Sequence, residues 1–357
     1  MAMLKVLGFA LYGPLAASTR YRLGQYMPGL AAAGIELEIH SLLGDAYLRR
    51  KFEGSPAHWG YLLQMGFQRL AVLLRRRNFD VAILHCELFP LMPGWLERLL
   101  LPSPYIYDFD DAFFLKYRTG RMSLLGPILG DKFDTVIEGA AAITPGNSYL
   151  ADYARGINSR TYCLPTVVDT SRYVPLTHPG GHPFTVGWVG SPSTAPYLVQ
   201  LMEPLFRLGQ EGALRLVVVG GKAPRIPGIE VEEVAWSEAT EVDWINRFDV
   251  GVMPLPDDDW ARGKCAFKLI QYMACGVPVV ASRVGANQDV VTGECGFLAA
   301  DAGEWIAALR QLRDQPGLRA SMGKAGRERI VAHFSLAGTL PRLAQVIRMV
   351  AGQSEAV

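Results

Sequence analysis

The chain has 357 residues, of which 50% are apolar and 19% charged, and this composition excludes an intrinsically disordered protein. A chain of this length is ordinarily divided between two domains. Its formal net charge of +1 creates no overall field that attracts a polyanion, so nucleic acid is excluded as a general partner and any anion must be bound locally.

The cysteines and the N-terminus are typical of a cytoplasmic protein. The five cysteines are odd in number and include no Cys-x-x-Cys pair, so neither a disulfide framework nor a zinc site is expected. Residues 4–9 resemble a first strand, without the charged start or cleavage site of a signal peptide. No window reaches the roughly 18 apolar residues that span a bilayer.

The first half alternates short apolar runs with helical patterns, which is typical of a parallel sheet with crossover helices. After the first strand, Ser18, Arg20 and Arg22 stand where a helix would begin. Two arginines at this point can bind a phosphate or a carboxylate. Alternatively, they cap a helix in water. The apolar runs that follow are Val81–Leu84, Tyr105–Tyr107 and Ala142–Thr144.

A helical pattern at residues 58–77 combines large apolar side chains with four arginines, Arg69 and Arg75–Arg77. A basic amphipathic helix of this kind can lie on anionic lipid. The other interpretation is an ordinary helix packed on the sheet.

Charged groups follow two of the predicted strands. His85 and Glu87 come after Val81–Leu84, and an acidic cluster at residues 108–111 comes after Tyr105–Tyr107. The carboxyl ends of parallel strands are where α/β domains place their sites. One of His85 and Glu87 is expected to act there, although a histidine satisfied within the core is the alternative.

A second series of strands begins at Phe184 and indicates a second Rossmann-like domain. The Pro- and Gly-rich run Pro175–Pro183 interrupts the alternation and is the predicted linker. We therefore expect one domain over residues 1–175 and another over 176–335. A last helix at about 336–350, after Phe334-Ser335, is expected to return to the first domain.

The segment Arg262–Ser282 reads as a basic loop, a helix, a Gly-Pro break and a buried strand. Lys264, Lys268 and the free N–H groups of the helix start favour a diphosphate at this point. Gln271 lies near the same helix face, where its amide can bond a ribose hydroxyl. A merely solvated amphipathic helix is the other interpretation. The preceding run Asp257–Asp259 predicts either a metal site or a solvated loop that orients Arg262.

With Pro254–Pro256 before it and Val284–Asn287 after it, this segment resembles the donor-site signature of family 4 glycosyltransferases. The resemblance extends over most of the second half. It implies the α/β GT-B fold, in which two Rossmann-like domains with parallel sheets face each other across a cleft, and transfer with retention of anomeric configuration. The further matching stretches are Pro165–Asp169, Gly187–Ser191, Val218–Gly221, Gly323–Arg327 and Phe334-Ser335.

The chain departs from the family at three places. Gly263 and Gln271 stand where the family's Glu-x7-Glu motif has its carboxylates, and the loop Ser191–Ala195 lacks the Arg and Lys that bind the donor phosphates in many relatives. The closest resemblance is to a subgroup with Gly-Lys-x-x-x-Lys, in which Lys264 and Lys268 would supply the charge. The predicted donor-binding residues are Gly190, Ser191, Ser193, Thr194, Arg262, Gly263, Lys264, Phe267, Lys268, Leu269 and Gln271.

In the absence of a sugar-side Glu, the groups of the first domain are the candidates for catalysis, since a carboxylate there can orient an acceptor hydroxyl or stabilise an oxocarbenium-like sugar. Asp108-Phe109-Asp110 also matches the metal motif of the single-domain GT-A fold, which would leave the second half unexplained. The predicted catalytic residues are His85, Glu87, Asp108, Asp110 and Asp111, and the predicted acceptor-binding residues are Ser18, Arg20 and Arg22.

The sequence thus predicts a retaining glycosyltransferase that needs neither a metal nor another cofactor. Its expected partners are a nucleotide-sugar donor, a carbohydrate or lipid-linked acceptor of bacterial polysaccharide or glycolipid synthesis, and the cytoplasmic face of the inner membrane. Two alternatives stay open. One is a sugar-nucleotide 2-epimerase of the same fold, and the other is an inactive donor-binding partner in a glycosyltransferase complex.

Overall fold

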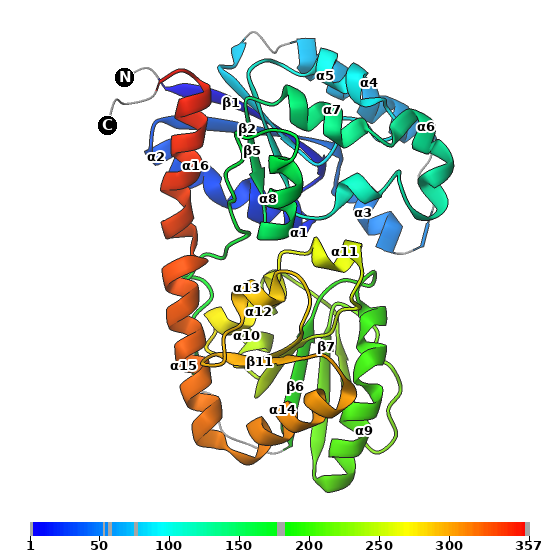
Figure 1. The fold of residues 1–357 in the computed structure, drawn as a ribbon, viewed down its shortest axis with the longest axis vertical. Helices are drawn as coiled ribbons and strands as arrows, with labels where there is room; N and C mark the ends of the chain where they lie inside the picture. Colours follow the sequence, from blue (N-terminus) through cyan, green and yellow to red (C-terminus); the bar gives the residue numbers. More distant parts are fainter. Residues whose placement is uncertain (1–2, 53, 56–58, 75–77, 177–182, 354–357) are drawn as a thin grey trace. The chain divides into compact units, whose positions relative to one another are not determined.

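The computed structural model describes residues 3–52, 54–55, 59–74, 78–176 and 183–353. The chain forms two compact units (Figure 1). The first comprises the chain up to Thr166, the tripeptide Gly263–Cys265 and the segment from Leu336 onward, and the second comprises Val167–Arg262 and Ala266–Ser335. Both are α/β units built on a parallel sheet, which confirms the predicted fold class.

The first unit has a five-stranded parallel sheet in the order β2-β1-β3-β4-β5. The inner strands are apolar along their length because helices cover both faces of such a sheet. Edge strand β2 instead alternates, with Glu36 and Glu38 exposed, and for this reason the apolar pattern does not reveal it. The strands are β1 (Leu4–Tyr12), β2 (Ile35–Leu43), β3 (Val81–His85), β4 (Tyr105–Phe109) and β5 (Ala142–Pro145).

The helices of the first unit include the last helix of the chain. That helix, α16 (Leu336–Val350), packs on α2, and Nη2 of Arg348 donates to the carbonyl of Ala33, 2.7 Å away. The others are α1 (Ala17–Arg22), η1 (Gly24–Tyr26), α2 (Met27–Ala32), α3 (Asp45–Phe52), α4 (Trp59–Leu74), α5 (Gly94–Leu100), η3 (Phe113–Leu115), η4 (Gly120–Leu125), α6 (Gly126–Leu129), α7 (Lys132–Gly139) and α8 (Ser148–Arg155).

The second unit has a six-stranded parallel sheet in the order β11-β10-β9-β6-β7-β8. The exposed edge strand β8, whose sequence is Glu-Val-Glu-Glu-Val, again lacks an apolar signature. The strands are β6 (Phe184–Val189), β7 (Leu214–Val219), β8 (Glu230–Val234), β9 (Val250–Met253), β10 (Val279–Ser282) and β11 (Gly296–Ala299). The helices are η5 (Ala195–Leu201), α9 (Met202–Glu211), α10 (Glu241–Ile245), α11 (Asp259–Arg262), α12 (Phe267–Ala274), α13 (Asn287–Val290), α14 (Ala302–Asp314) and α15 (Pro316–His333).

The boundary between the units lies between Thr166 and Val167, earlier than the predicted end of the first domain at residue 175. The difference arises because Val168 forms a parallel bridge with Ser335, and Tyr173 is buried in the core of the second unit. Most of the predicted linker, residues 177–182, lies outside the described residues. Within the described ranges, no helix is both long enough and apolar enough to span a bilayer.

Candidate functional site

Polar side chains meet where the strands of the first sheet end. His85 is the last residue of β3, and the strand register pairs it with Asp108 near the end of β4. Thr144 occupies the matching position on β5. Arg22, the last residue of α1, completes the group through its bonds to Asp108. Because the strands are parallel, groups distant in sequence are brought to one edge of the sheet.

Asp108 accepts hydrogen bonds from all three neighbours. Its Oδ2 lies 2.8 Å from Nδ1 of His85, its Oδ1 lies 2.6 Å from Oγ1 of Thr144, and Arg22 donates to both oxygens through Nε and Nη2. Burial alone would raise the pKa of Asp108, but Arg22 and His85 outweigh it and hold this pKa well below its usual range. Asp108 is therefore a buried anion whose oxygens are already bonded.

This arrangement changes two predicted roles. Asp108, predicted to be catalytic, acts instead on His85 and Arg22 as a positioning residue. Arg22, predicted to bind the acceptor, is 5% exposed, and it also donates to the carbonyls of Leu164 and Thr144. Its guanidinium thus holds strand ends together and has no open face for an acceptor.

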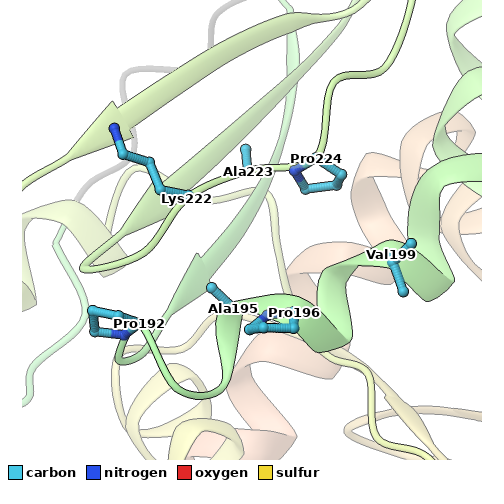
Figure 2. A pocket seen from close by; sticks show the side chains of 7 residues that line it. All are labelled: Pro192, Ala195, Pro196, Val199, Lys222, Ala223 and Pro224. Carbon is cyan, nitrogen blue, oxygen red and sulfur yellow. The ribbon is translucent and has the colours of Figure 1, made fainter. Parts of the chain in front are cut away.

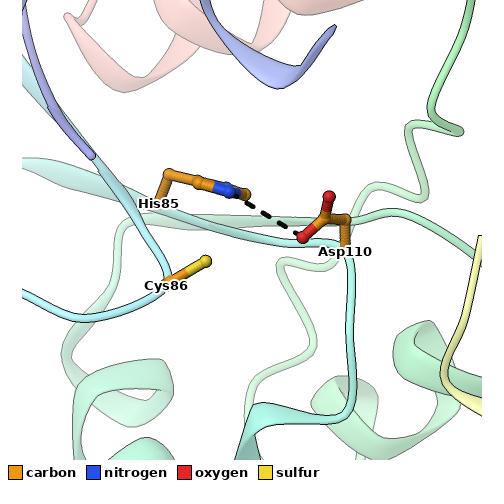
Figure 3. Close-up of side chains that lie close together, drawn as sticks. All are labelled: His85, Cys86 and Asp110. Atoms are coloured by element: carbon orange, nitrogen blue, oxygen red, sulfur yellow. Dashed lines mark ion pairs between the residues drawn. The ribbon is translucent and has the colours of Figure 1, made fainter. Parts of the chain in front are cut away.

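His85 carries a polar atom that the fold does not use. Its Nε2 is buried without a hydrogen-bond partner, and Oδ1 of Asp110 lies 3.8 Å away (Figure 3). Burial favours the neutral imidazole, but the bond to Asp108 and the charge of Asp110 outweigh it and raise the pKa of His85. A buried nitrogen left unbonded at a strand end is suited to bind a hydroxyl group of a ligand.

His85, Cys86 and Asp110 are also close enough together to share a metal ion. One ligand atom from each lies within 4.8 Å of the other two (Figure 3). A set of nitrogen, sulfur and oxygen suits a cation such as Zn²⁺. Burial and the nearby carboxylates raise the pKa of the Cys86 thiol well above its usual value, which opposes the thiolate form that a metal needs. The expectation that no metal is required remains a prediction.

Glu87, the alternative to His85 in the sequence, belongs to a buried ionic cluster. Its carboxylate binds Nζ of Lys132 at 2.7 Å, the hydroxyl of Tyr117 at 2.8 Å and Nζ of Lys116. Despite burial, the two lysines lower its pKa. Lys132 also pairs with Glu97, whose pKa burial raises to about 7. Glu87 was predicted as a possible catalytic group, but these bonds give it a structural role.

Helix α1 carries the other predicted acceptor residues, Ser18 and Arg20. Nη1 of Arg20 donates to the carbonyls of Pro14 at 2.8 Å and Leu15 at 2.9 Å, so this side chain shapes the loop between β1 and α1. Ser18 is half-buried on α1. The acceptor role of Ser18 and Arg20 remains a prediction.

The tripeptide Gly263–Cys265 was predicted in the second domain but belongs to the first unit. Nδ2 of Asn147 donates to the carbonyl of Gly263 at 2.9 Å and to that of Lys264 at 3.0 Å. Asn147 also caps α8 by accepting from the N–H of Leu150. The sequence offered one signal for Asn147, since it follows a strand and precedes a helix, as N-cap residues do.

The surroundings of this tripeptide explain why position 263 holds a glycine. A Cβ at Gly263 would lie 2.6 Å from Cβ and 2.8 Å from the backbone nitrogen of Ala112, too close for any side chain. The next residue, Lys264, is directed to Asp111, with Nζ 3.4 Å from Oδ1. Lys264 would have to leave Asp111 in order to bind a diphosphate.

In the second unit, the loop after β6 lies beside the start of α12. Gly190 follows β6, and a Cβ there would lie 2.9 Å from Cε of Lys268 and 2.3 Å from the ring of Trp188. Nζ of Lys268 lies 5.4 Å from the centroid of that ring. Ala266, with φ of 51°, turns the chain into α12 without a side-chain cap on the helix start. Positive charge and uncapped N–H groups thus occur together, which favours an anion.

The polar loop after Gly190 is bonded within itself. Oγ of Ser191 lies 2.8 Å from Oγ of Ser193, and Oγ1 of Thr194 donates to the carbonyl of Ser191 at 3.2 Å. Ser193 is exposed and the other two are half-buried. The loop therefore presents hydroxyl groups without a charge of its own, and the side chain of Lys268 lies beside Gly190 at its start.

Three other predicted donor residues on α12 lie in or against the core. Leu269 is fully buried and its N–H donates to the carbonyl of Ala266, so the packing of the core accounts for this residue and its predicted donor contact remains a prediction. Phe267 packs partly against the same core. Gln271 is 2% exposed and donates from Nε2 to the hydroxyl of Tyr173, 2.9 Å away. Its predicted contact with ribose would have to use the amide oxygen or the second N–H of Nε2.

Arg262 is bound by the acidic run that precedes it. Its Nε lies 2.8 Å from Oδ1 of Asp257, and its Nη1 lies 3.3 Å from Oδ1 of Asp259. All three side chains are largely exposed. The run thus contacts Arg262 through two exposed ion pairs, as the loop interpretation predicted, and the metal interpretation remains untested.

In the second unit, a cavity of about 280 Å³ lies next to the polar loop that follows Gly190 (Figure 2). One side is formed by the loop after β6 and the start of η5, and the other by the chain that follows β7. Its walls are mainly apolar, which suits a flat ring more than a phosphate. The lining residues are Pro192, Ala195, Pro196, Val199, Lys222, Ala223 and Pro224.

Comparison with known proteins first identifies the class of fold. The structure is similar to that of Anabaena HepE in complex with UDP-glucose, with a TM-score of 0.71 at 13% identity over 97% of this chain and 100% of that one. The fold is therefore GT-B, as predicted. At this identity, the similarity concerns the fold alone.

The sequence comparisons include one family model and several relatives. Residues 183–315 match the family model described as glycosyl transferases group 1. The chain is 29% identical to the phosphatidyl-myo-inositol mannosyltransferase of Propionibacterium freudenreichii subsp. shermanii, over 79% of this chain and 73% of that one. It is 34% identical to the D-inositol 3-phosphate glycosyltransferase of Arthrobacter sp. over 85 residues, which span 23% of this chain and only 19% of the relative.

Proposed function

We propose that the protein is a glycosyltransferase that moves a sugar from a nucleotide-sugar donor to a hydroxyl acceptor. One observation carries the proposal. The region that matches the glycosyltransferase family model, residues 183–315, contains the Gly190 loop and the Lys268 helix start, where the second unit gathers its features for binding an anion.

The diphosphate of the donor binds at the start of α12. Lys268 neutralises it, the N–H groups of the helix start donate to it, and Ser191, Ser193 and Thr194 offer hydroxyl groups. The glycine at 190 keeps the loop close to the lysine stem, which supports this arrangement. As the sugar leaves, negative charge grows on the diphosphate, so the same groups stabilise the transition state. Lys264 and Arg262 add charge when they leave their carboxylate partners.

The candidate catalytic groups of this proposal belong to the first unit. Gly263 cannot carry the family's carboxylate, whereas Asp110 and Nε2 of His85 lie together with no hydrogen bond between them. Asp111, which shares its charge with Lys264, belongs to the same group. In this proposal, His85 and Asp110 contact the sugar or the acceptor, and no metal takes part.

The stereochemistry and the setting follow from the family resemblance. The sugar is transferred with retention, by front-side attack. The reaction takes place in the cytoplasm, on a carbohydrate or lipid-linked acceptor of bacterial polysaccharide or glycolipid synthesis. The names of relatives that act on phosphatidyl-myo-inositol and inositol phosphate support a polyol or glycolipid acceptor.

A thermal-shift screen with UDP, GDP, ADP and dTDP tests donor binding, because a ligand that binds only the folded state raises its melting temperature. We expect one of them to stabilise the protein and Lys268→Ala to abolish that shift. The matching nucleotide sugar is then incubated with a panel of polyols and glycolipids, with and without EDTA. A glycoside formed equally in both supports the proposal.

The same experiment separates the two alternatives. A sugar isomerised in the absence of any acceptor would identify a 2-epimerase. Nucleotide binding without turnover across the panel would identify an inactive donor-binding partner. If no nucleotide shifts the melting temperature, the proposal is wrong.

A further inference from the structure

Helix α4 of the first unit is held to the sheet by one face. Leu73 is buried there, and Leu62 packs on the cluster of Leu11, Leu42 and Leu43. Arg69 is fully buried, and its Nη2 donates to the carbonyls of Ala10 at 2.6 Å and His40 at 2.9 Å. Burial lowers the pKa of Arg69 to about 9. This arginine, expected on a basic outer face, instead fixes which side of α4 faces the core.

The exposed side of α4 carries five large apolar side chains. They recur at steps of four, four, three and four residues, a spacing that places them in one stripe along the helix. Single exposed apolar residues are ordinary, but a contiguous stripe of this size marks an interaction surface. The α4 stripe consists of Trp59 (80% exposed), Leu63 (61%), Phe67 (69%), Leu70 (41%) and Leu74 (85%).

The charges of α4 and its neighbours indicate what covers the stripe. Trp59–Leu74 contains no acidic residue, and its one charged residue is the buried Arg69. In the sequence, Leu74 is followed directly by Arg75–Arg77. The preceding helix α3 ends in the exposed residues Arg49, Arg50 and Lys51. An apolar stripe without carboxylates, on a helix that basic residues precede and follow in the sequence, complements an anionic lipid surface.

We propose that the α4 stripe docks the protein on an anionic lipid bilayer, with the helix lying in the plane of the interface. The inference deepens the proposed function and rests on it in one respect, since a lipid-linked acceptor gives the docking its purpose. At about 1.5 Å per residue, α4 is roughly 24 Å long, so its side chains can insert as a row. A Trp at one end suits the headgroup boundary.

The test measures co-sedimentation of the full chain with vesicles. One set contains phosphatidylcholine alone and the other contains phosphatidylcholine mixed with phosphatidylglycerol. The double variant Leu63→Gln/Phe67→Gln removes the middle of the α4 stripe. The control, Phe206→Gln/Val331→Gln, removes two exposed apolar side chains of the second unit, at 42% and 46%, that lie away from the cavity. Circular dichroism checks that all variants are folded.

We expect the wild type and the control to bind the anionic vesicles and the α4 variant to bind at least about tenfold less, because each buried apolar side chain contributes strongly to insertion. Binding to phosphatidylcholine alone should be much weaker. Nucleotide-induced thermal shifts should be unchanged in all three proteins, so a failure of docking is distinguished from a failure of the proposed function.

Three outcomes overturn the inference. The wild type does not bind anionic vesicles, or the α4 variant binds them as well as the control does. In the third, the wild type is a dimer in solution and only the α4 variant is a monomer, in which case the stripe is covered by a second copy of the chain.

Discussion

The two units differ in where they keep their charged groups. Among the described residues, the second unit buries one charged side chain, Glu241, whereas the first unit buries seven. These seven are Arg22, Arg69, His85, Glu87, Glu97, Asp108 and Lys132. The first unit thus assembles its strand ends around ion pairs, while the second keeps its polar loop and its cations near the surface.

Because of this difference, substitutions in the two units should affect different properties of the protein. A buried ion pair is costly to break from one side, because the remaining charge stays in a medium that solvates it poorly. An exposed cation can be removed at little cost to the fold. Substitutions at the first site should therefore reduce stability, whereas substitutions at the second should reduce ligand affinity alone.

The largest expected effect on stability is that of Asp108→Asn. The substitution leaves the buried Arg22 without its counter-charge, so we expect the free energy of unfolding to fall by about 3–5 kcal/mol. Urea denaturation measures the change. In the control, Asp257→Asn, an exposed partner of Arg262 is removed and the expected loss is about 0–1 kcal/mol. Equal losses in the two variants would contradict the contrast.

The stability of the first unit should also depend on pH through Asp108 and His85. The pKa of Asp108 is lowered in the folded protein, so its contribution is present above the unfolded value of about 3.9 and is lost as pH falls through the folded value. The pKa of His85 is raised, so its contribution is present below about 6.5 and is lost as pH rises through the folded value. In the Asp108→Asn variant, the free energy of unfolding, measured by urea denaturation, should therefore depend less on pH at both the acidic and the alkaline end.

Lys268→Ala should affect binding without affecting the fold. A charge-assisted hydrogen bond contributes about 1.5–3 kcal/mol, so the dissociation constant of the nucleoside diphosphate should rise by roughly 10–150-fold. Isothermal titration calorimetry measures it. Lys324→Ala, which removes an exposed lysine from α15, is the matched control and should bind like the wild type. If the Lys268→Ala protein binds the nucleoside diphosphate as tightly as the wild type does, the diphosphate does not bind at Lys268.

The smallest expected effect is that of Gly263→Ala. The new Cβ would meet the backbone nitrogen of Ala112 at 2.8 Å, and relieving the clash should cost about 1–3 kcal/mol of stability. Gly317→Ala is the control, because a Cβ at Gly317 meets nothing within 4 Å. The control should be neutral or gain up to about 1 kcal/mol. Melting temperatures of the two variants decide whether position 263 is closed to side chains.

The sequence predicted the fold well wherever strands are apolar. The inner strands β1, β3, β4, β6 and β10 were found from their apolar runs, because both faces of a parallel sheet are covered. The edge strands β2 and β8 were not found, because their outward side chains are charged. Helix α12 was placed correctly because a glycine-lysine loop precedes it and a Gly-Pro break follows it.

The candidate site was predicted less completely. The sequence placed His85 and Asp108 at strand ends. It did not show that the carboxylate of Asp108 is hydrogen-bonded to Arg22, His85 and Thr144. It also left His85 and Glu87 as equals. Only the structure shows that Lys116 and Lys132 bind Glu87. The hydrogen-bond partners of these polar atoms are distant in the chain. A local sequence pattern therefore cannot predict which of the atoms remain without a hydrogen bond.

The contact between Gly263 and Ala112 has a consequence for sequence surveys. Either position alone reads as an unremarkable small residue, yet the space at 263 exists only as far as the backbone at 112 permits. The two positions should therefore covary among related proteins. A carboxylate at 263 is expected only where the stretch equivalent to residues 110–112 is shorter or follows another course.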